Sequence, residues 1–315
     1  MKRQYDADVD AVDSPCRWLD RALFMVSFRL YATLRFTLNY HDHPAISASK
    51  LKKIACGTPI DYWAAYEDPN RMPVQPTDAM KQGSLVDCLI TEPQNFDRKY
   101  VVAPKVDRRT KAGKAAWESC EEQARANLAT VISSEWFHTA KLIASKLRND
   151  PVASVYLQGQ GQEPFFWYDT DHQLDCRYLP DIEDPDRGLL VDLKKSRSAN
   201  PAHFSRQAYS LGYDIQVAHY AEGYRDRYGE YPKQIILFAY EWQWPHNWSV
   251  NVISDDLLEE GRRRREEAMC LIKECRGINE WPSWGVHVMD APRWIRPDDP
   301  ANDTDADDLG LEGLE

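Results

Sequence analysis

The spacing of hydrophobic and polar residues becomes regular from Ser47 onward, and it differs between two parts of the chain. From Ser47 to Leu147, stretches with apolar residues at helical spacing follow one another, with little strand character between them. From Glu163 to Ile253, aromatic and alternating segments typical of strands are interleaved with further helical stretches. This order predicts an α/β fold with a small sheet flanked by helices and a helical N-terminal section.

Local signals delimit the elements. Ser47 or Ser49 can cap a first short helix, Thr58-Pro59 opens a second, and Asp78 caps a third that ends at the Glu92-Pro93 step. The predicted helices lie at about 16–38, 47–56, 58–63, 78–90, 111–128, 133–147, 201–210, 212–228 and 254–275, and the strands at 163–169, 174–179, 187–194, 234–242 and 248–253. Residues 1–42 are interpreted as an N-terminal extension, 43–290 as one domain, and 291–315 as a disordered acidic tail.

Composition excludes several classes of protein. Among 315 residues, 43% are hydrophobic and 28% charged, which is too apolar for a disordered chain. No run of eighteen apolar residues is present, so we expect no membrane span. The seven cysteines are scattered and form no C-x-x-C pair. They favour free thiols in a cytoplasmic protein without disulfides, and their spacing predicts no iron–sulfur cluster.

The acidic net charge of −11 is unevenly distributed. From Asp298 to the C-terminus there are eight acidic residues and no basic ones, so the rest of the chain carries −3. The near-neutral body therefore leaves room for a basic surface that binds nucleic acid.

The strongest chemical pattern is Pro180-Asp181 followed by Asp192-Leu193-Lys194 at the end of an apolar strand. Side chains alternate along a strand, so Asp192 and Lys194 should point to the same face. Asp181 and, from a neighbouring strand, Glu163 are candidates to join them. Converging carboxylates require a cation, which a hard divalent metal supplies. A surface salt bridge between Asp192 and Lys194 is the simpler interpretation of this short motif taken alone.

The wider pattern favours the metal site. Gln216 and Tyr220 are four residues apart on the next helix and can both face it. The ordered set Glu163, Leu179-Pro180-Asp181, Leu190-Val191-Asp192-Leu193-Lys194-Lys195-Ser196 and Gly212 to Tyr220 resembles the PD-(D/E)xK nuclease superfamily, and within it the RecE (exonuclease VIII)-type phage exonucleases. The resemblance extends over about His43 to Trp284.

This resemblance implies a restriction-endonuclease-like core and a metal-dependent 5′–3′ exonuclease acting on linear double-stranded DNA. Mg²⁺, which Mn²⁺ could replace, would be held by Asp181, Asp192, the Leu193 carbonyl and Asp87, with Lys194 and Glu163 completing the catalytic set. The exposed 3′ strand would pass to a single-strand annealing protein during recombination. A ring-shaped homo-oligomer is also implied. An endonuclease, a single-strand nuclease and an inactive DNA-end-binding module remain alternatives.

Asp87 and a basic cluster at residues 108–114 are two further candidate sites. Relatives carry a histidine where this chain has Asp87, and aspartate is itself a good ligand for a hard metal. Arg108, Arg109, Lys111 and Lys114 surround a predicted helix start, where cations and the helix terminus both favour phosphate. A solvated loop is the alternative interpretation of this basic cluster.

Overall fold

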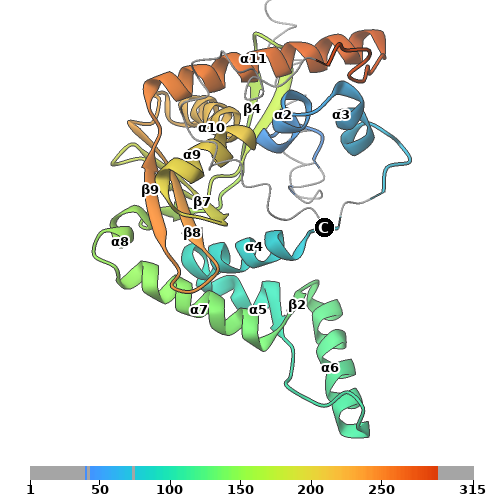
Figure 1. The fold of residues 1–315 in the computed structure, drawn as a ribbon, viewed down its shortest axis with the longest axis vertical. Helices are drawn as coiled ribbons and strands as arrows, with labels where there is room; N and C mark the ends of the chain where they lie inside the picture. The colour runs from blue at the N-terminus through green and yellow to red at the C-terminus, as the bar shows by residue number, and fades with distance from the viewer. Residues whose placement is uncertain (1–39, 41–42, 73–74, 290–315) are drawn as a thin grey trace, which may run out of the picture.

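The fold is organised around a five-stranded mixed sheet (Figure 1). A computed structural model describes residues 40, 43–72 and 75–289 of the chain. The strand order is β3 (Gln160–Gly161), β6 (Ile182–Asp184), β7 (Leu189–Ser196), β8 (Gln234–Glu241) and β9 (Trp248–Val252). β7 and β8 pair in parallel and the other neighbours antiparallel. The predicted α/β class with a small mixed sheet is therefore confirmed.

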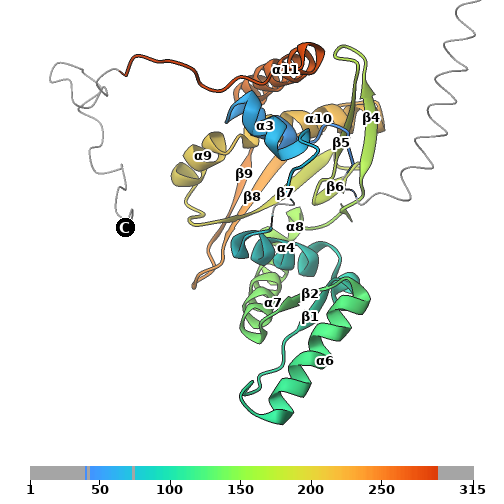
Figure 2. The ribbon, with the colours of Figure 1, turned by 90° about the vertical axis from the view of Figure 1, so that its right-hand side faces the viewer.

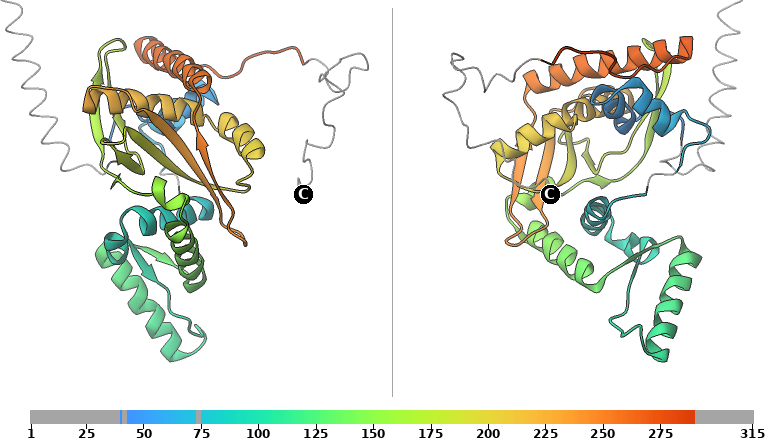
Figure 3. Two further views of the ribbon diagram at one scale, coloured as in Figure 1. Left: turned by 90° about the vertical axis from the view of Figure 1, so that its left-hand side faces the viewer. Right: turned by 45° about the vertical axis from the view of Figure 1, so that its right-hand side comes forward.

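Helices cover both faces of this sheet (Figure 3). One hydrophobic core lies under α2 (Ala48–Ala55), α3 (Pro59–Tyr66), α9 (Pro201–Ser210), α10 (Tyr213–Tyr228) and α11 (Asp255–Ile278). The other lies against α4 (Asp78–Thr91), α7 (Ser134–Asn149) and α8 (Ala153–Tyr156). Leu190 belongs to the first core, whereas Val191 and Leu193 belong to the second. The predicted alternation along this strand is confirmed, with both of its faces buried.

A separate two-stranded ribbon lies beside the main sheet. β4 (Phe165–Asp169) and β5 (Leu174–Tyr178) pair antiparallel and form no part of the five-stranded sheet. The turn predicted at Asp171-His172 joins them. The ribbon packs against α10, where a side chain at Gly223 would approach the Tyr178 ring to 2.5 Å.

A small βαβ arm projects from the body (Figure 2). It begins after the short helices η2 (Pro93–Asn95) and α5 (Phe96–Lys99) and consists of β1 (Tyr100–Val102), α6 (Lys111–Asn127) and β2 (Thr130–Ile132). β1 and β2 pair in parallel, and α6 is the crossover between them. A minor core of Val101, Cys120 and Ala124 holds the arm together.

Capping chemistry explains most of the predicted helix starts. Thr58 and Asp61 form a reciprocal capping box on α3, and Ser47 is the N-cap of α2. The prediction that Asp78 caps α4 is wrong, because the Thr77 hydroxyl accepts the Met80 N–H and Asp78 is the first helical residue. β1, β2, β3 and β6 were not predicted, since two or three residues are too few to show a period.

The predicted helix at 16–38 and the acidic tail from Asp298 lie outside the described residues. Within the described part of the chain, no helix is both long and apolar enough to cross a membrane.

Close packing between α10 and α11 depends on Gly261. A β-carbon at this position would lie 2.1 Å from the Asp214 carbonyl oxygen at the start of α10. The Arg264 guanidinium, one turn further along α11, binds both carboxylate oxygens of Asp214 at 2.8 and 2.9 Å. The glycine therefore lets the two backbones approach closely enough for this buried ion pair to form.

We predict that Gly261→Ala destabilises the protein by about 1–3 kcal/mol, because the added methyl must push the helices apart. Gly277→Ala on the same helix is the matched control. Nothing lies within 4 Å of its added β-carbon, so it should be neutral or slightly stabilising. Urea denaturation of both variants measures the difference. Equal stability of the two would contradict the role given to Gly261.

Candidate functional site

A cleft of about 740 Å³ opens between α4 and the end of β7. Its lining is mostly polar or cationic and includes Gln82, Gly83, Asp87, Lys194, Lys195, Arg197, Tyr213 and Trp242. Lys195 donates to Gln82 at 3.0 Å across the cleft and lies 6.0 Å from the centre of the Trp242 ring. Asp87, Leu193 and Lys194, which the sequence pattern predicted as site residues, line this cleft.

Asp192 lies at the centre of a buried polar network. It is 2% exposed, and its Oδ1 accepts a 2.7 Å hydrogen bond from Gln216 Nε2 on α10. Lys52, from α2, donates to Gln216 Oε1 at 2.8 Å. Because that bond assigns the amide oxygen to Lys52, the amide nitrogen must face Asp192. Asp192 Oδ2 forms an ion pair with the Lys194 ammonium.

Asp181 lies beside this network, just before β6. Its Oδ2 accepts the Leu193 N–H at 2.7 Å, and the Gln162 side chain also hydrogen-bonds to it. Burial and then the neighbouring Asp192 carboxylate raise the pKa of Asp181 to about 7. Asp192 is therefore close enough to oppose the ionisation of Asp181.

Asp87 brings a third carboxylate from α4. Tyr240, on β8, donates to its Oδ1 at 3.2 Å. Burial, followed by repulsion from Asp181, raises the pKa of Asp87 well above its usual range. Asp87 therefore interacts electrostatically with Asp181, Asp192 and Lys194, and it lines the same cleft as Lys194.

Lys194 is the cation that these acids surround. Burial by itself lowers the pKa of a lysine, but the Asp192 carboxylate outweighs this and raises the pKa of Lys194 above its ordinary value. Its ammonium also lies 4.7 Å from the centre of the Tyr213 ring. Lys194 is thus held protonated in this arrangement.

The arrangement fits a hard divalent cation. Asp87, Asp181 and Asp192 interact electrostatically across this site, and the buried Asp192 Oδ2 makes no hydrogen bond of normal geometry, its partner being the Lys194 ion pair. Oxygen donors with surplus negative charge are the ligands that Mg²⁺ and Mn²⁺ prefer. Asp87, Asp181 and Asp192 would hold such an ion, and Leu193 lies between them along the cleft.

The prediction that Glu163 joins the site is wrong. Glu163 precedes β4. That strand belongs to the separate ribbon, so it is not a neighbour of β7 in the main sheet. Its exposed carboxylate forms an ion pair with Arg227 on α10, which also binds the buried Glu183. The arginine therefore holds Glu163 away from Asp181, even though the adjacent Gln162 reaches that residue.

Gln216 and Tyr220, the two site residues predicted on α10, make different contacts. Gln216 contacts Asp192 directly, whereas the buried Tyr220 donates to the Leu179 carbonyl at 3.1 Å, next to the Pro180-Asp181 step. Tyr220 therefore supports the backbone that presents Asp181.

The predicted basic cluster lies outside the cleft. The four residues are exposed around the N-terminal end of α6, on the projecting arm: Arg108, Arg109, Lys111 and Lys114. Thr110 caps that helix by accepting the Gly113 N–H at 3.0 Å, and the Arg108 guanidinium stacks 4.1 Å from the Trp117 ring centre.

Sequence reasoning missed Lys52, Tyr213 and Tyr240. Lys52 lies on a short helix 164 residues before Gln216, and no spacing signal connects the two. Tyr213 lies within the recognised segment from Gly212 to Tyr220, so its position could have suggested a role. Tyr240 reads as an ordinary aromatic residue in a buried strand.

Comparison with known proteins identifies the sequence family. Residues 47–287 match the sequence family DUF3799, described as a PDDEXK-like domain of unknown function. No curated protein matches the chain.

Two solved structures are similar. The crystal structure of a proposed exonuclease from Eubacterium rectale is 16% identical, with a TM-score of 0.55 over 79% of this chain and 90% of that one. A phage-related exonuclease from Haemophilus somnus is 14% identical, with a TM-score of 0.31 over 61% and 95% of the two chains. The first likeness supports the fold; the second is too distant to carry an argument.

We predict that Asp87→Asn raises the melting temperature in EDTA and reduces the stabilisation that Mg²⁺ provides. The change removes one of three mutually repelling buried charges, and it also removes a metal ligand. The gain in EDTA should be a few degrees, since about 1 kcal/mol shifts a protein of this size by about 2–4 °C.

Asp78→Asn, at the exposed start of the same helix, is the control and should leave the response to Mg²⁺ unchanged. Thermal unfolding with and without Mg²⁺ provides the measurement. A full Mg²⁺ response in Asp87→Asn would remove Asp87 from the cation site.

Proposed function

Because the chain belongs to the DUF3799 family of PDDEXK-like domains, we propose that it is a metal-dependent nuclease that degrades linear double-stranded DNA from its ends. The observation that carries this proposal is the ion pair of Asp192 with Lys194 at one end of a cationic cleft, with Asp87 and Asp181 in electrostatic interaction with both. The order Pro180-Asp181 followed by Asp192-Leu193-Lys194 resembles that of a phosphodiester-cleaving centre of this family.

A divalent cation bound by the three aspartates would neutralise phosphate charge and acidify a bound water. The chain's own residues have separate tasks. Leu193 N–H and Gln162 fix the Asp181 carboxylate, and the Lys52–Gln216 pair fixes that of Asp192. Lys194, held protonated, is suited to orienting a water and stabilising negative charge that develops on the phosphate.

The cleft has the composition expected for nucleic acid. Lys195 and Arg197 add positive charge beside Lys194, and Trp242 and Tyr213 provide aromatic surface on which a base can stack. The tip of the β8–β9 hairpin extends this surface with Trp244, which is 83% exposed. We infer that a DNA strand end enters here, with the hairpin on one side and α4 on the other.

The finer features follow from the family resemblance and are part of the proposal. They are 5′–3′ polarity, a ring-shaped homo-oligomer that encloses the duplex, and delivery of the exposed 3′ strand to a single-strand annealing protein. An endonuclease on the same fold and an inactive DNA-end-binding module are the competing functions. The intact set of three carboxylates and one lysine favours an active enzyme over the binding module.

Digestion of a duplex labelled separately at its 5′ and 3′ ends tests this function. With Mg²⁺ we expect early release of the 5′ label, no digestion of a covalently closed circle and no reaction in EDTA. Ca²⁺ should support binding of DNA without cleavage, because it acidifies water less. Nicking of the closed circle would favour the endonuclease, and undiminished activity in EDTA would exclude the metal mechanism.

Asp181→Asn and Asp192→Asn are the matched inactive variants. Each keeps the shape of the side chain but loses the charge that a cation requires, so cleavage should fall by at least about a hundredfold while DNA binding persists. Glu163→Gln is the control, since its carboxylate pairs with Arg227, and it should retain most of the activity. If it were as inactive as Asp192→Asn, Glu163 would belong to the catalytic set.

We also propose that the arm contacts the phosphate backbone. Lys111→Ala combined with Lys114→Ala should weaken duplex binding uniformly across sequences and lower the slope of log K against log salt by about 1–2. The double variant Lys233→Ala/Lys273→Ala removes the same charge from exposed positions elsewhere. Equal loss of affinity in the two variants would show a non-specific effect of net charge.

A further inference from the structure

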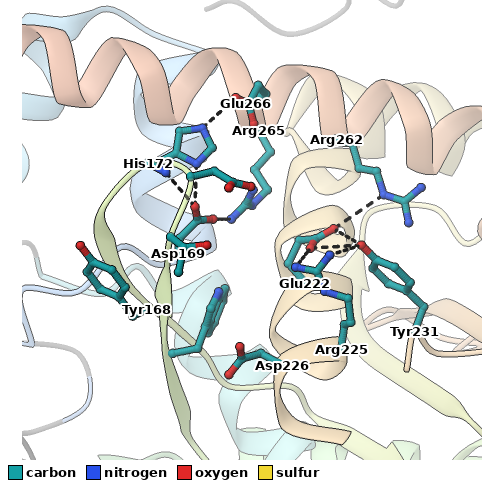
Figure 4. Close-up of a pocket in the computed structure, with 13 residues that line it drawn as sticks. Tyr168, Asp169, His172, Glu222, Arg225, Asp226, Tyr231, Arg262, Arg265 and Glu266 are labelled. Carbon is teal, nitrogen blue, oxygen red and sulfur yellow. Dashed lines mark hydrogen bonds and ion pairs between the residues drawn. The ribbon is translucent and has the colours of Figure 1, made fainter. Parts of the chain in front are cut away.

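A second group of side chains that could hold a metal ion lies outside the proposed catalytic cleft, between the β4–β5 turn and α11. Figure 4 shows two of them, His172 and Glu266. His172 comes from the turn, and Glu266 and Cys270 come from α11. One ligand atom of each, Nε2, a carboxylate oxygen and Sγ, lies within 4.8 Å of the others. Glu266 and Cys270 are four residues apart, so they lie on one face of the helix.

His172 is oriented as metal-binding histidines usually are. It is 5% exposed, and its Nδ1 lies 2.8 Å from Asp169 Oδ1, while its Nε2 points to Glu266 Oε1, also at 2.8 Å. Asp169 is itself fixed by an ion pair with the buried Arg265, whose Nη2 donates to Oδ2 at 2.6 Å. A carboxylate on the far nitrogen of the ring sets the tautomer in which Nε2 carries a lone pair.

This orientation leaves a lone pair of His172 facing a carboxylate oxygen. A neutral imidazole donates one hydrogen bond, and both of its nitrogens here face acceptors. Either a second proton on the ring or a metal ion between Nε2 and Oε1 resolves this. Cys270 Sγ lies 3.9 Å from the same Glu266 oxygen, to which its thiol donates, and as a thiolate it would supply a third ligand at this point.

We propose that His172, Glu266 and Cys270 bind a divalent metal ion of the zinc class. Nitrogen, oxygen and sulfur donors together suit Zn²⁺ better than Mg²⁺, and three protein ligands leave a fourth position for water. That position faces a polar cavity of about 480 Å³ lined by Asp169, Glu222, Arg225, Tyr231 and Arg262, among others. The ion would join the tip of the ribbon to α11, adding to the link that Arg265 makes.

Cobalt provides a spectroscopic test that does not depend on nuclease activity. The full chain is stripped with EDTA, desalted and titrated with Co²⁺. We expect a thiolate-to-cobalt absorption band that saturates near one equivalent, and Zn²⁺ should displace it. The catalytic cleft supplies only oxygen donors and should give no such band, so Asp192→Asn should retain it in full.

The variants separate the two explanations. Cys270→Ser and His172→Gln should each lose the band, whereas Cys56→Ser, at another exposed cysteine, should keep it. Zn²⁺ should raise the melting temperature of the wild type and of Cys56→Ser but not that of Cys270→Ser. Cys270 is exposed, so its serine variant should fold, and circular dichroism checks this.

A wild-type protein without the band, or a Cys270→Ser variant that keeps it, would overturn the proposal. The group would then be a protonated histidine held between Asp169 and Glu266. Failure of the proposed nuclease function would leave this result untouched, because neither readout involves DNA.

Discussion

The electrostatic interaction of three carboxylates with Lys194 is the interaction around which the part of the structure that contains the cleft is arranged. Each acid comes from a different element: Asp87 from α4, Asp181 from the segment before β6, and Asp192 from β7. Placing these charges together in a buried site costs free energy, which a single lysine offsets only in part. The surrounding fold must therefore hold them there, and it does so with directed hydrogen bonds.

Those hydrogen bonds extend into both cores. Gln216 reaches Asp192 from α10, and Lys52 reaches Gln216 from α2, so one carboxylate is fixed by two helices of the first core. Tyr240 reaches Asp87 from β8 on the side of the second core. The parallel β7–β8 pair lies between them and carries both Asp192 and Tyr240. A change in the packing of either helical layer should therefore alter the positions of the carboxylates.

The arm and the ribbon are accessory elements outside the five-stranded sheet. The arm is a self-contained βαβ unit with its own small core, and it places the exposed basic cluster away from the cleft. The ribbon is tied to α10 and α11 through charged residues, including Arg227 with Glu163 and Arg265 with Asp169. The first of these ion pairs gives Glu163, which the sequence suggested as a catalytic residue, a structural partner.

The sequence by itself determined the class of fold, most helices and the residues of the strand that carries Asp192 and Lys194, because period and capping are local properties. It also identified Asp87, Asp181 and Gln216, since the spacing of a known motif connects them. Only the tertiary structure decided that Glu163 is bound by Arg227, that Lys52 orients Gln216, and that His172 meets Cys270. These pairs are separated by 64 to 164 residues or depend on which strands share a sheet, and no local pattern records either.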